Sequence, residues 1–153
     1  MITAGVDEVG RGCLAGPVVS AAVILNDSIN LKLLKDSKKI TFKKRIEIAK
    51  HIRLNSTYAV GISSVEEILN LNILQAALLS MKRAIDKLVI KPELILIDGN
   101  FAPKGLKNSK TIINGDEKIK SISAASIIAK VFRDQLMIKL SEEFNNYAWE
   151  RNF

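Results

Sequence analysis

Acidic side chains stand at three places where a predicted apolar strand comes to an end. Asp7 and Glu8 lie side by side after ITAGV, Asp98 ends ELILID, and Asp116 follows TIING. Carboxylates brought close together cannot all remain ionised unless their charge is compensated. A hard divalent cation is the usual compensation, and ligation by oxygen alone favours Mg²⁺ or Mn²⁺ over Zn²⁺. The sequence therefore predicts a magnesium or manganese site, provided that these four acids converge.

Such a set of acids could hold two cations across a phosphodiester, which would activate a water and stabilise the leaving oxygen. Each acid alone has an ordinary alternative, because strand-end aspartates often cap turns or pair with nearby lysines. Asp7 and Glu8 are adjacent, so in a regular strand their side chains point to opposite faces. Both serve one site only if the strand ends or bends there, which Gly10 would allow. Asp134, inside a predicted helix, is interpreted as an ion-pairing or packing acid.

The glycine-rich segment after Glu8 has two competing interpretations. The run Gly10-Arg11-Gly12-Cys13-Leu14-Ala15 matches the G-x-G-x-x-G/A fingerprint of dinucleotide sites. That fingerprint requires a helix to follow, because the N-terminus of the helix holds the pyrophosphate. Here Pro17 and a β-branched run follow, so the segment is predicted to connect two strands. A plain hairpin connection is favoured, although it leaves the two acids and the arginine unexplained.

The elements that must position these acids follow from the periodicity of apolar residues, which has a period of two in strands and 3.6 in helices. Ser64 and Glu67 have the spacing of a capping box, which places a helix start there. The order of elements favours a single α/β domain over 1–153, with a central mixed β-sheet flanked by α-helices. The predicted strands are 2–7, 17–25, 56–63, 93–98 and 111–115, and the predicted helices are 41–55, 64–72, 72–88 and about 122–143.

The composition limits the class of protein. The chain has 153 residues, with 23 Lys and Arg against 16 Asp and Glu, and a formal charge of +7. This surplus fits a polyanionic partner, nucleic acid or an anionic membrane, and equally fits an ordinary lysine-rich surface. No signal peptide or membrane-spanning run is visible, and the single cysteine excludes an internal disulfide. We expect a soluble, cytoplasmic monomer that does not insert into a membrane.

Four blocks of the chain resemble the type 2 ribonuclease H (ribonuclease HII) family. They appear in the family's order and at fitting separations: GVDEVGRGCLAGPVV at 5–19, DSKKI at 36–40, LILIDGN at 94–100 and GDEKIKSISAASIIAKVFRD at 115–134. The resemblance implies an RNase H-like fold and an endonuclease that hydrolyses the RNA strand of RNA/DNA hybrids. It also implies cleavage at single ribonucleotides within duplex DNA, leaving 5′-phosphate and 3′-hydroxyl ends. The family's four metal ligands, which bind Mg²⁺ or Mn²⁺, correspond to Asp7, Glu8, Asp98 and Asp116.

The same resemblance implies contacts with the nucleic acid. The family's GRG loop, whose backbone recognises the 2′-hydroxyl of the ribonucleotide, corresponds to Gly10, Arg11 and Gly12. Glycines permit such a close approach of the main chain, and the 2′-hydroxyl distinguishes RNA from DNA. The segment that contacts phosphates corresponds to Ser37, Lys38 and Lys39. Further contacts with the nucleic-acid backbone are implied for Ser123, Ser126 and Lys130, although Lys130 could equally be a solvated helix lysine.

The chain departs from the family pattern at its C-terminus. After a stretch such as FNNYAWERNF at 144–153, the family continues to a Gly-Tyr-Gly-Thr-like segment, whose tyrosine stacks at the cleavage junction, and to further helices. Tyr147 resembles an earlier, structural tyrosine. One stacking aromatic contributes about 1–3 kcal/mol, so a chain naturally lacking that segment is expected to have reduced activity or junction specificity. The alternative is a relative that binds RNA/DNA hybrids without efficient turnover.

Overall fold

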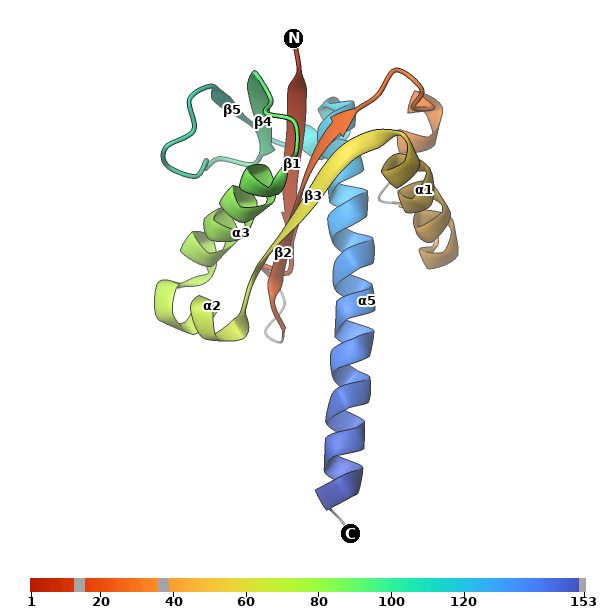
Figure 1. Ribbon diagram of the computed structural model, residues 1–153, viewed down its shortest axis with the longest axis vertical. Helices are drawn as coiled ribbons and strands as arrows, with labels where there is room; N and C mark the ends of the chain where they lie inside the picture. Colours follow the sequence, from red (N-terminus) through yellow and green to blue (C-terminus); the bar gives the residue numbers. More distant parts are fainter. Residues whose placement is uncertain (13–15, 36–38, 152–153) are drawn as a thin grey trace.

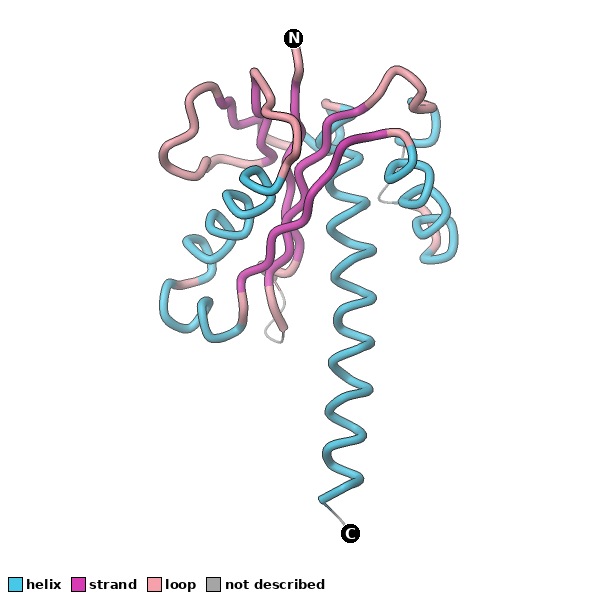
Figure 2. The backbone as a smooth tube through the Cα atoms, in the orientation of Figure 1, coloured by secondary structure: helices cyan, strands magenta, loops and turns pink. Residues whose placement is uncertain are grey.

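A computed structural model of the protein describes residues 1–12, 16–35 and 39–151, with side chains up to Asn145. These residues build a five-stranded mixed sheet in the order β3-β2-β1-β4-β5, as Figures 1 and 2 show. The first three strands form an antiparallel meander, whereas β1, β4 and β5 are parallel. The strands are β1 (Thr3–Val9), β2 (Val18–Leu25), β3 (Ser56–Ser63), β4 (Leu94–Asp98) and β5 (Ser109–Ile112). The mixed α/β sheet predicted from the sequence is confirmed.

Helices cover both faces of this sheet. One face packs against α1 (Phe42–Leu54) and α5 (Lys120–Arg151), through an aliphatic core that includes Val19, Ala21, Ile52 and Ile128. The other face packs against α3 (Ile73–Lys87), which is preceded by the short helix α2 (Val65–Leu71). Two further short elements are the 3-10 helix η1 (Leu31–Leu34) and α4 (Gly115–Lys118). In Figure 1 the C-terminal part of α5 extends well beyond the sheet.

Glycines let the two helix layers lie unusually close to the sheet. A Cβ added at Gly5 would lie 2.2 Å from the carbonyl carbon of Ser121, where α5 crosses β1. A Cβ added at Gly61 would lie 2.1 Å from the carbonyl oxygen of Ser80 in α3. Backbone atoms cannot yield to a methyl group as a flexible side chain can. The first turn of α5 is therefore fixed against β1, two residues before Asp7.

The structure corrects the predicted boundaries near the acids. β1 continues to Val9 rather than ending at Asp7, and β5 spans 109–112 rather than 111–115. The chain turns at Asn114, which has a left-handed φ of 55°, and Asp116 lies in α4 instead of at a strand tip. Elements of four residues, such as α4 and η1, are too short to show a helical period. The long helix spans 120–151 rather than about 122–143.

Only part of the predicted apolar side of the long helix is buried. Ile122, Ala125 and Ile128 are buried against the sheet, but Phe132 is 37% exposed and Leu140 is 40% exposed. Phe132 lies between buried Val131 and Arg133, so the helix still packs there and Phe132 is on its outer side. Leu140 belongs to the C-terminal part of α5, which extends beyond the sheet. None of the described helices is both long enough and apolar enough to span a bilayer.

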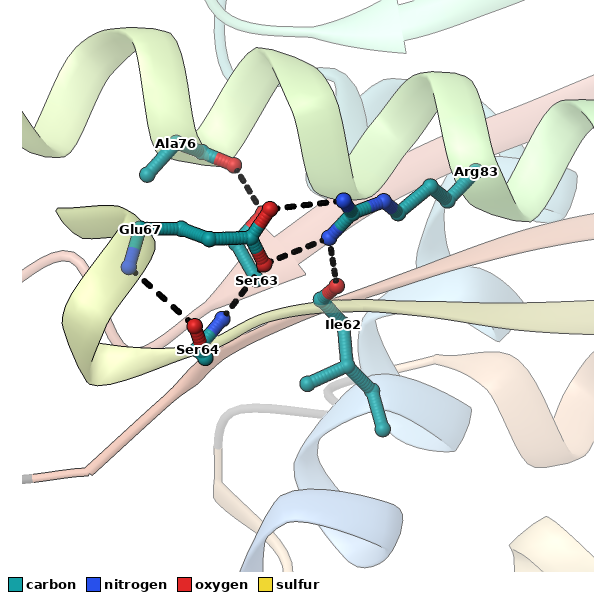
Figure 3. Close-up of polar contacts among 6 residues, drawn as sticks. All are labelled: Ile62, Ser63, Ser64, Glu67, Ala76 and Arg83. Carbon is teal, nitrogen blue, oxygen red and sulfur yellow. Dashed lines mark hydrogen bonds and ion pairs between the residues drawn. The ribbon is translucent and has the colours of Figure 1, made fainter. Parts of the chain in front are cut away.

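An ion pair joins α2 to α3 on the face opposite α5. Arg83 donates from Nη1 and Nη2 to the two carboxylate oxygens of Glu67, at 2.7 and 2.6 Å, and also to the carbonyl oxygen of Ile62 (Figure 3). Glu67 completes the predicted capping box with Ser64, since the side chain of each accepts from the backbone N–H of the other. These hydrogen bonds, above all those from Arg83, lower the pKa of Glu67 to about 2.

Replacing Glu67 with Gln is expected to lower the melting temperature at neutral pH. Because the carboxylate of Glu67 has a lower pKa in the folded chain, its stabilisation is fully present above the unfolded value of 4.5 and is lost as the pH falls through about 2. The difference in melting temperature between wild type and Glu67→Gln should therefore shrink between these pH values. Glu66→Gln, which removes an exposed charge from the same helix turn, is the matched control. A difference that stayed constant with pH would contradict the assignment.

Candidate active site

The parallel pairing of β1 with β4 brings two of the predicted acids together. Val6 is paired with Ile97 in this register, so Asp7 and Asp98, the next residue on each strand, lie beside each other at the same edge. Parallel neighbouring strands place their carboxyl ends at a common edge of the sheet. The convergence of Asp7 with Asp98 is thus a consequence of strand order and register, neither of which the sequence spacing contains.

Asp98 in turn positions Asp116. Its Oδ1 accepts a hydrogen bond of 2.6 Å from the backbone N–H of Gly115 and a longer one, 3.4 Å, from that of Asp116. These are N–H groups of the first turn of α4, which have no partner within the helix. The ordinary role considered for a strand-end aspartate, capping a turn, is therefore present. The contact that caps α4 also holds the backbone of Asp116 next to the side chain of Asp98.

Asp7 and Glu8 do point to opposite sides of a regular strand. Gly5 contacts α5 and Val9 packs in the core beneath α5, so Asp7 between them faces the α5 layer and Glu8 faces the other. The two residues are nevertheless coupled electrostatically, since the charge of Glu8 raises the pKa of Asp7, and the backbone N–H of Glu8 donates to Asp7 Oδ1. The strand neither ends nor breaks its pairing at these residues, because β1 stays in register with β2 as far as Val9, so the expected early end before Gly10 is not present.

Burial and mutual repulsion disfavour the ionised forms of Asp7 and Glu8. Asp7 is 6% exposed, and its pKa is raised well above the usual value by burial first, and then by the charges of Glu8 and Asp98, with a smaller effect from Asp116. Burial also raises the pKa of Glu8, opposed chiefly by the positive charge of Arg11. The Arg11 Nη1 atom lies 3.7 Å from the Glu8 Oε1 atom. Arg11 thus offsets only part of the effect of burial on Glu8.

One atom of this group has no hydrogen-bond partner. The Oε2 atom of Glu8 is fully buried and unpaired, which costs about 1–3 kcal/mol unless something binds it. A divalent cation binds carboxylate oxygens and would relieve both this cost and the repulsion of the neighbouring acids. Among the described residues, no group of three or more Asp, Glu, His or Cys side chains is placed so that together they could hold a metal ion. The fit of a cation therefore rests on the chemistry of the donors, which are the buried carboxylate of Asp7 and the unpaired Glu8 Oε2 atom.

The glycine-rich segment lies directly beside these acids. Gly10 is buried and has a φ of 108°, whereas Arg11 and Gly12 are exposed. Strand β2 follows the segment, which confirms the predicted strand-to-strand connection and leaves no helix for a pyrophosphate. Among the described residues, a Cβ added at Gly12 would meet no atom within 4 Å.

The other predicted substrate contacts are distributed differently. Lys39 is exposed, and Ser37 and Lys38 lie outside the described residues. Ser126 is partly buried on α5. Lys130, also on α5, pairs with Asp134 at 2.9 Å, in agreement with the interpretation of Asp134 as an ion-pairing acid.

Ser123 requires a correction. Its side chain is only 2% exposed, and its hydroxyl donates to the carbonyl oxygen of Leu34 at the end of η1. A hydroxyl in that position is turned into the protein and holds η1 against the start of α5. The structure therefore gives Ser123 a structural role in place of the expected substrate contact.

Sequence reasoning missed Arg133. This arginine of α5 is 6% exposed, and its Nε donates to the carbonyl oxygen of Pro17 at 2.9 Å. The run Phe132-Arg133-Asp134 looks like an ordinary helix surface, and a contact across 116 residues leaves no local pattern. The one available signal was that Arg133 falls near the buried stripe of the helix, where an unpaired charge is costly.

Comparison with known proteins gives a consistent result. The sequence matches the family described as Ribonuclease HII over residues 4–153. A protein named Ribonuclease HII from Pelagibacter ubique (strain HTCC1062) is 63% identical over 153 residues, which cover 99% of this chain and 82% of that protein. Another of the same name, from Macrococcus caseolyticus (strain JCSC5402), is 50% identical over 151 residues, covering 99% and 57% of the two chains.

Solved structures agree with this match. The crystal structure of ribonuclease H2 from Pyrococcus horikoshii OT3 superposes with a TM-score of 0.79 at 32% identity, covering 94% of this chain and 77% of that one. The crystal structure of Bst-RNase HIII in complex with Mn²⁺ shares the fold, with a TM-score of 0.76 at 24% identity, covering 94% and 55%.

Proposed function

The chain belongs to the ribonuclease HII family of metal-dependent endoribonucleases, and we propose that it cuts the RNA strand of RNA/DNA hybrids and also cuts at single ribonucleotides embedded in duplex DNA. The observation that supports the proposal is the buried, unpaired Glu8 Oε2 atom on the strand where Asp7 lies beside Asp98, which in turn contacts the backbone of Asp116. The relative with bound Mn²⁺ supports a metal of the same kind here.

We assign the metal ligands to Asp7, Glu8, Asp98 and Asp116, and the cations to Mg²⁺ or Mn²⁺. When bound, two such ions would activate a water and stabilise the leaving 3′-oxygen, so that hydrolysis leaves 5′-phosphate and 3′-hydroxyl ends. The protein itself supplies the positions of the carboxylates. The capping contact from Gly115 orients Asp98, and the backbone N–H of Glu8 donates to Asp7 Oδ1 at 2.8 Å.

Recognition of the ribonucleotide is assigned to the backbone of Gly10, Arg11 and Gly12. These residues begin two positions after Glu8, so a ribose bound by their N–H and C=O groups would place the adjacent phosphate near the acids. A 2′-hydroxyl is both a donor and an acceptor, and it is absent from DNA. Phosphates on either side would meet cationic or hydroxyl side chains: Ser37, Lys38, Lys39, Ser126 and Lys130.

The proposal is tested with three duplexes of one sequence: an RNA/DNA hybrid, a DNA duplex with one ribonucleotide, and an all-DNA duplex. With Mg²⁺ or Mn²⁺, the first two should be cut and the third left intact, and the products should accept ligation or labelling as 5′-phosphate and 3′-hydroxyl ends. With the metal chelated, all three should remain intact. Tight binding of the first two duplexes without any cleavage would show a hybrid-binding protein instead.

A further inference from the structure

A buried arginine lies at the base of the segment to which ribose recognition is assigned. Arg133 extends from α5 to the connection between β1 and β2, and its Nε donates to the carbonyl oxygen of Pro17. A guanidinium cannot lose its charge at neutral pH and is costly to bury unless its N–H groups are bound. The hydrogen bond from Arg133 to Pro17 therefore both satisfies part of the buried guanidinium and links the β1–β2 connection to α5.

Two glycines make room for this side chain. Gly10 and Gly16, which lie at opposite ends of the connection, both have positive φ, at 108° and 96°. A Cβ at Gly10 would lie 2.7 Å from Arg133 Nε, and one at Gly16 would lie 3.2 Å from Arg133 Nη2 and 2.4 Å from Met137 Sδ. The arginine thus occupies the space between the two ends of the connection, and side chains there would displace it.

Arg133 lies against the first residue of the recognition segment. Gly10 is the first residue of that segment and follows β1 directly, and the side chain of Arg133 fills the space beside its Cα. Recognition through backbone groups has no side-chain rotamers to adjust, and a misplacement of about 1 Å can remove most of the benefit of orientation. A rigid support for the backbone is what such recognition requires.

We propose that Arg133 is a positioning residue for ribonucleotide recognition: it holds Gly10 and Pro17 so that the backbone of residues 10–12 meets the ribose 2′-hydroxyl. The inference rests on the proposed function of this segment. In this role Arg133 does not bind the metal, and it does more than stabilise the fold. Its loss should reduce the preference for a ribonucleotide and leave general DNA binding in place.

The test measures binding of two duplexes, one all-DNA and one with a single ribonucleotide, by fluorescence anisotropy in Mg²⁺ at fixed salt. The parent protein carries Asp98→Asn, so that the duplexes stay intact. The protein compared with it carries Asp98→Asn and Arg133→Met together. The ratio of the affinity for the ribonucleotide-containing duplex to that for the all-DNA duplex should be about tenfold lower with Arg133→Met than in the parent, which corresponds to roughly one hydrogen bond. The affinity for the all-DNA duplex should change less than about twofold. Lys139→Met, which removes an exposed charge from the same helix, is the control and should retain the ratio.

The outcomes separate the two proposals. A ratio retained in Arg133→Met, or an equal loss of affinity for both duplexes, overturns the positioning role while the proposed function stands. A parent without any preference for the ribonucleotide also overturns the inference, whereas the proposed function stands or falls with cleavage of the three duplexes by the unsubstituted protein. If Arg133→Met fails to fold, Arg133→Lys decides, because it keeps the charge but has no donor at the ε position. A reduced ratio in Arg133→Lys supports the role, and an unchanged ratio overturns it.

Discussion

Asp98→Asn should reduce cleavage of a duplex with one ribonucleotide by at least about a hundredfold, with little change in the folded structure. Substitutions outside the ligand shell of a metal site typically cost 10–100-fold, so loss of a direct ligand should cost at least as much. The amide of Asn retains an oxygen at the position that accepts from Gly115. The cap of α4 is therefore kept, and the variant loses one negative charge and little else.

The measurement is the rate of product formation at saturating metal, together with the melting temperature and circular dichroism of the variant. Asp86→Asn is the matched control, because it makes the same chemical change in an exposed ion pair with Lys82 on α3. That control should keep the full cleavage rate. If Asp98→Asn cut at more than a tenth of the wild-type rate while folded, Asp98 would not be a metal ligand.

Asp7→Asn should raise the melting temperature of the metal-free protein while abolishing cleavage. Burial and the charges of Glu8 and Asp98 raise the pKa of Asp7, so the folded chain holds this proton more tightly than the unfolded chain. Ionisation at neutral pH therefore destabilises the fold. Removing one poorly compensated buried charge is worth on the order of 1–3 kcal/mol, and each kcal/mol corresponds to roughly 2–4 °C in a chain of this size. Asn retains the oxygen that accepts from the N–H of Glu8.

Thermal unfolding with and without Mg²⁺ or Mn²⁺ checks this prediction. A ligand that binds only the folded state stabilises it by mass action, so the wild type should melt at a higher temperature when metal is added. Asp7→Asn should start higher and respond much less to metal. The assignment of a cation to these carboxylates fails if metal leaves the wild-type melting temperature unchanged, or if Asp7→Asn is destabilised in metal-free buffer. Asp86→Asn should respond to metal as the wild type does.

The local elements near the acids could be predicted only in part. Apolar runs such as 94–98 and capping signals such as Ser64 with Glu67 act over a few residues, so they are visible in the sequence. The α4 turn was missed because it is four residues long and is stabilised from outside, by Asp98. The predicted range of β5 differs from the observed one because Ser109 and Lys110, at the sheet edge, are polar and do not give the pattern of a buried strand.

The sequence by itself determined the chemical character of the protein: four acids without histidine or cysteine beside them, a glycine-rich connection followed by a strand, and the order of elements. These depend on residue type and short spacing. Only the tertiary structure decided that Asp7 meets Asp98, because that contact depends on β1 pairing in parallel with β4 in one register. It likewise brought Arg133 to Pro17 and turned Ser123 inward. Contacts across about a hundred residues are set by the packing of whole elements, which leaves no trace in local spacing.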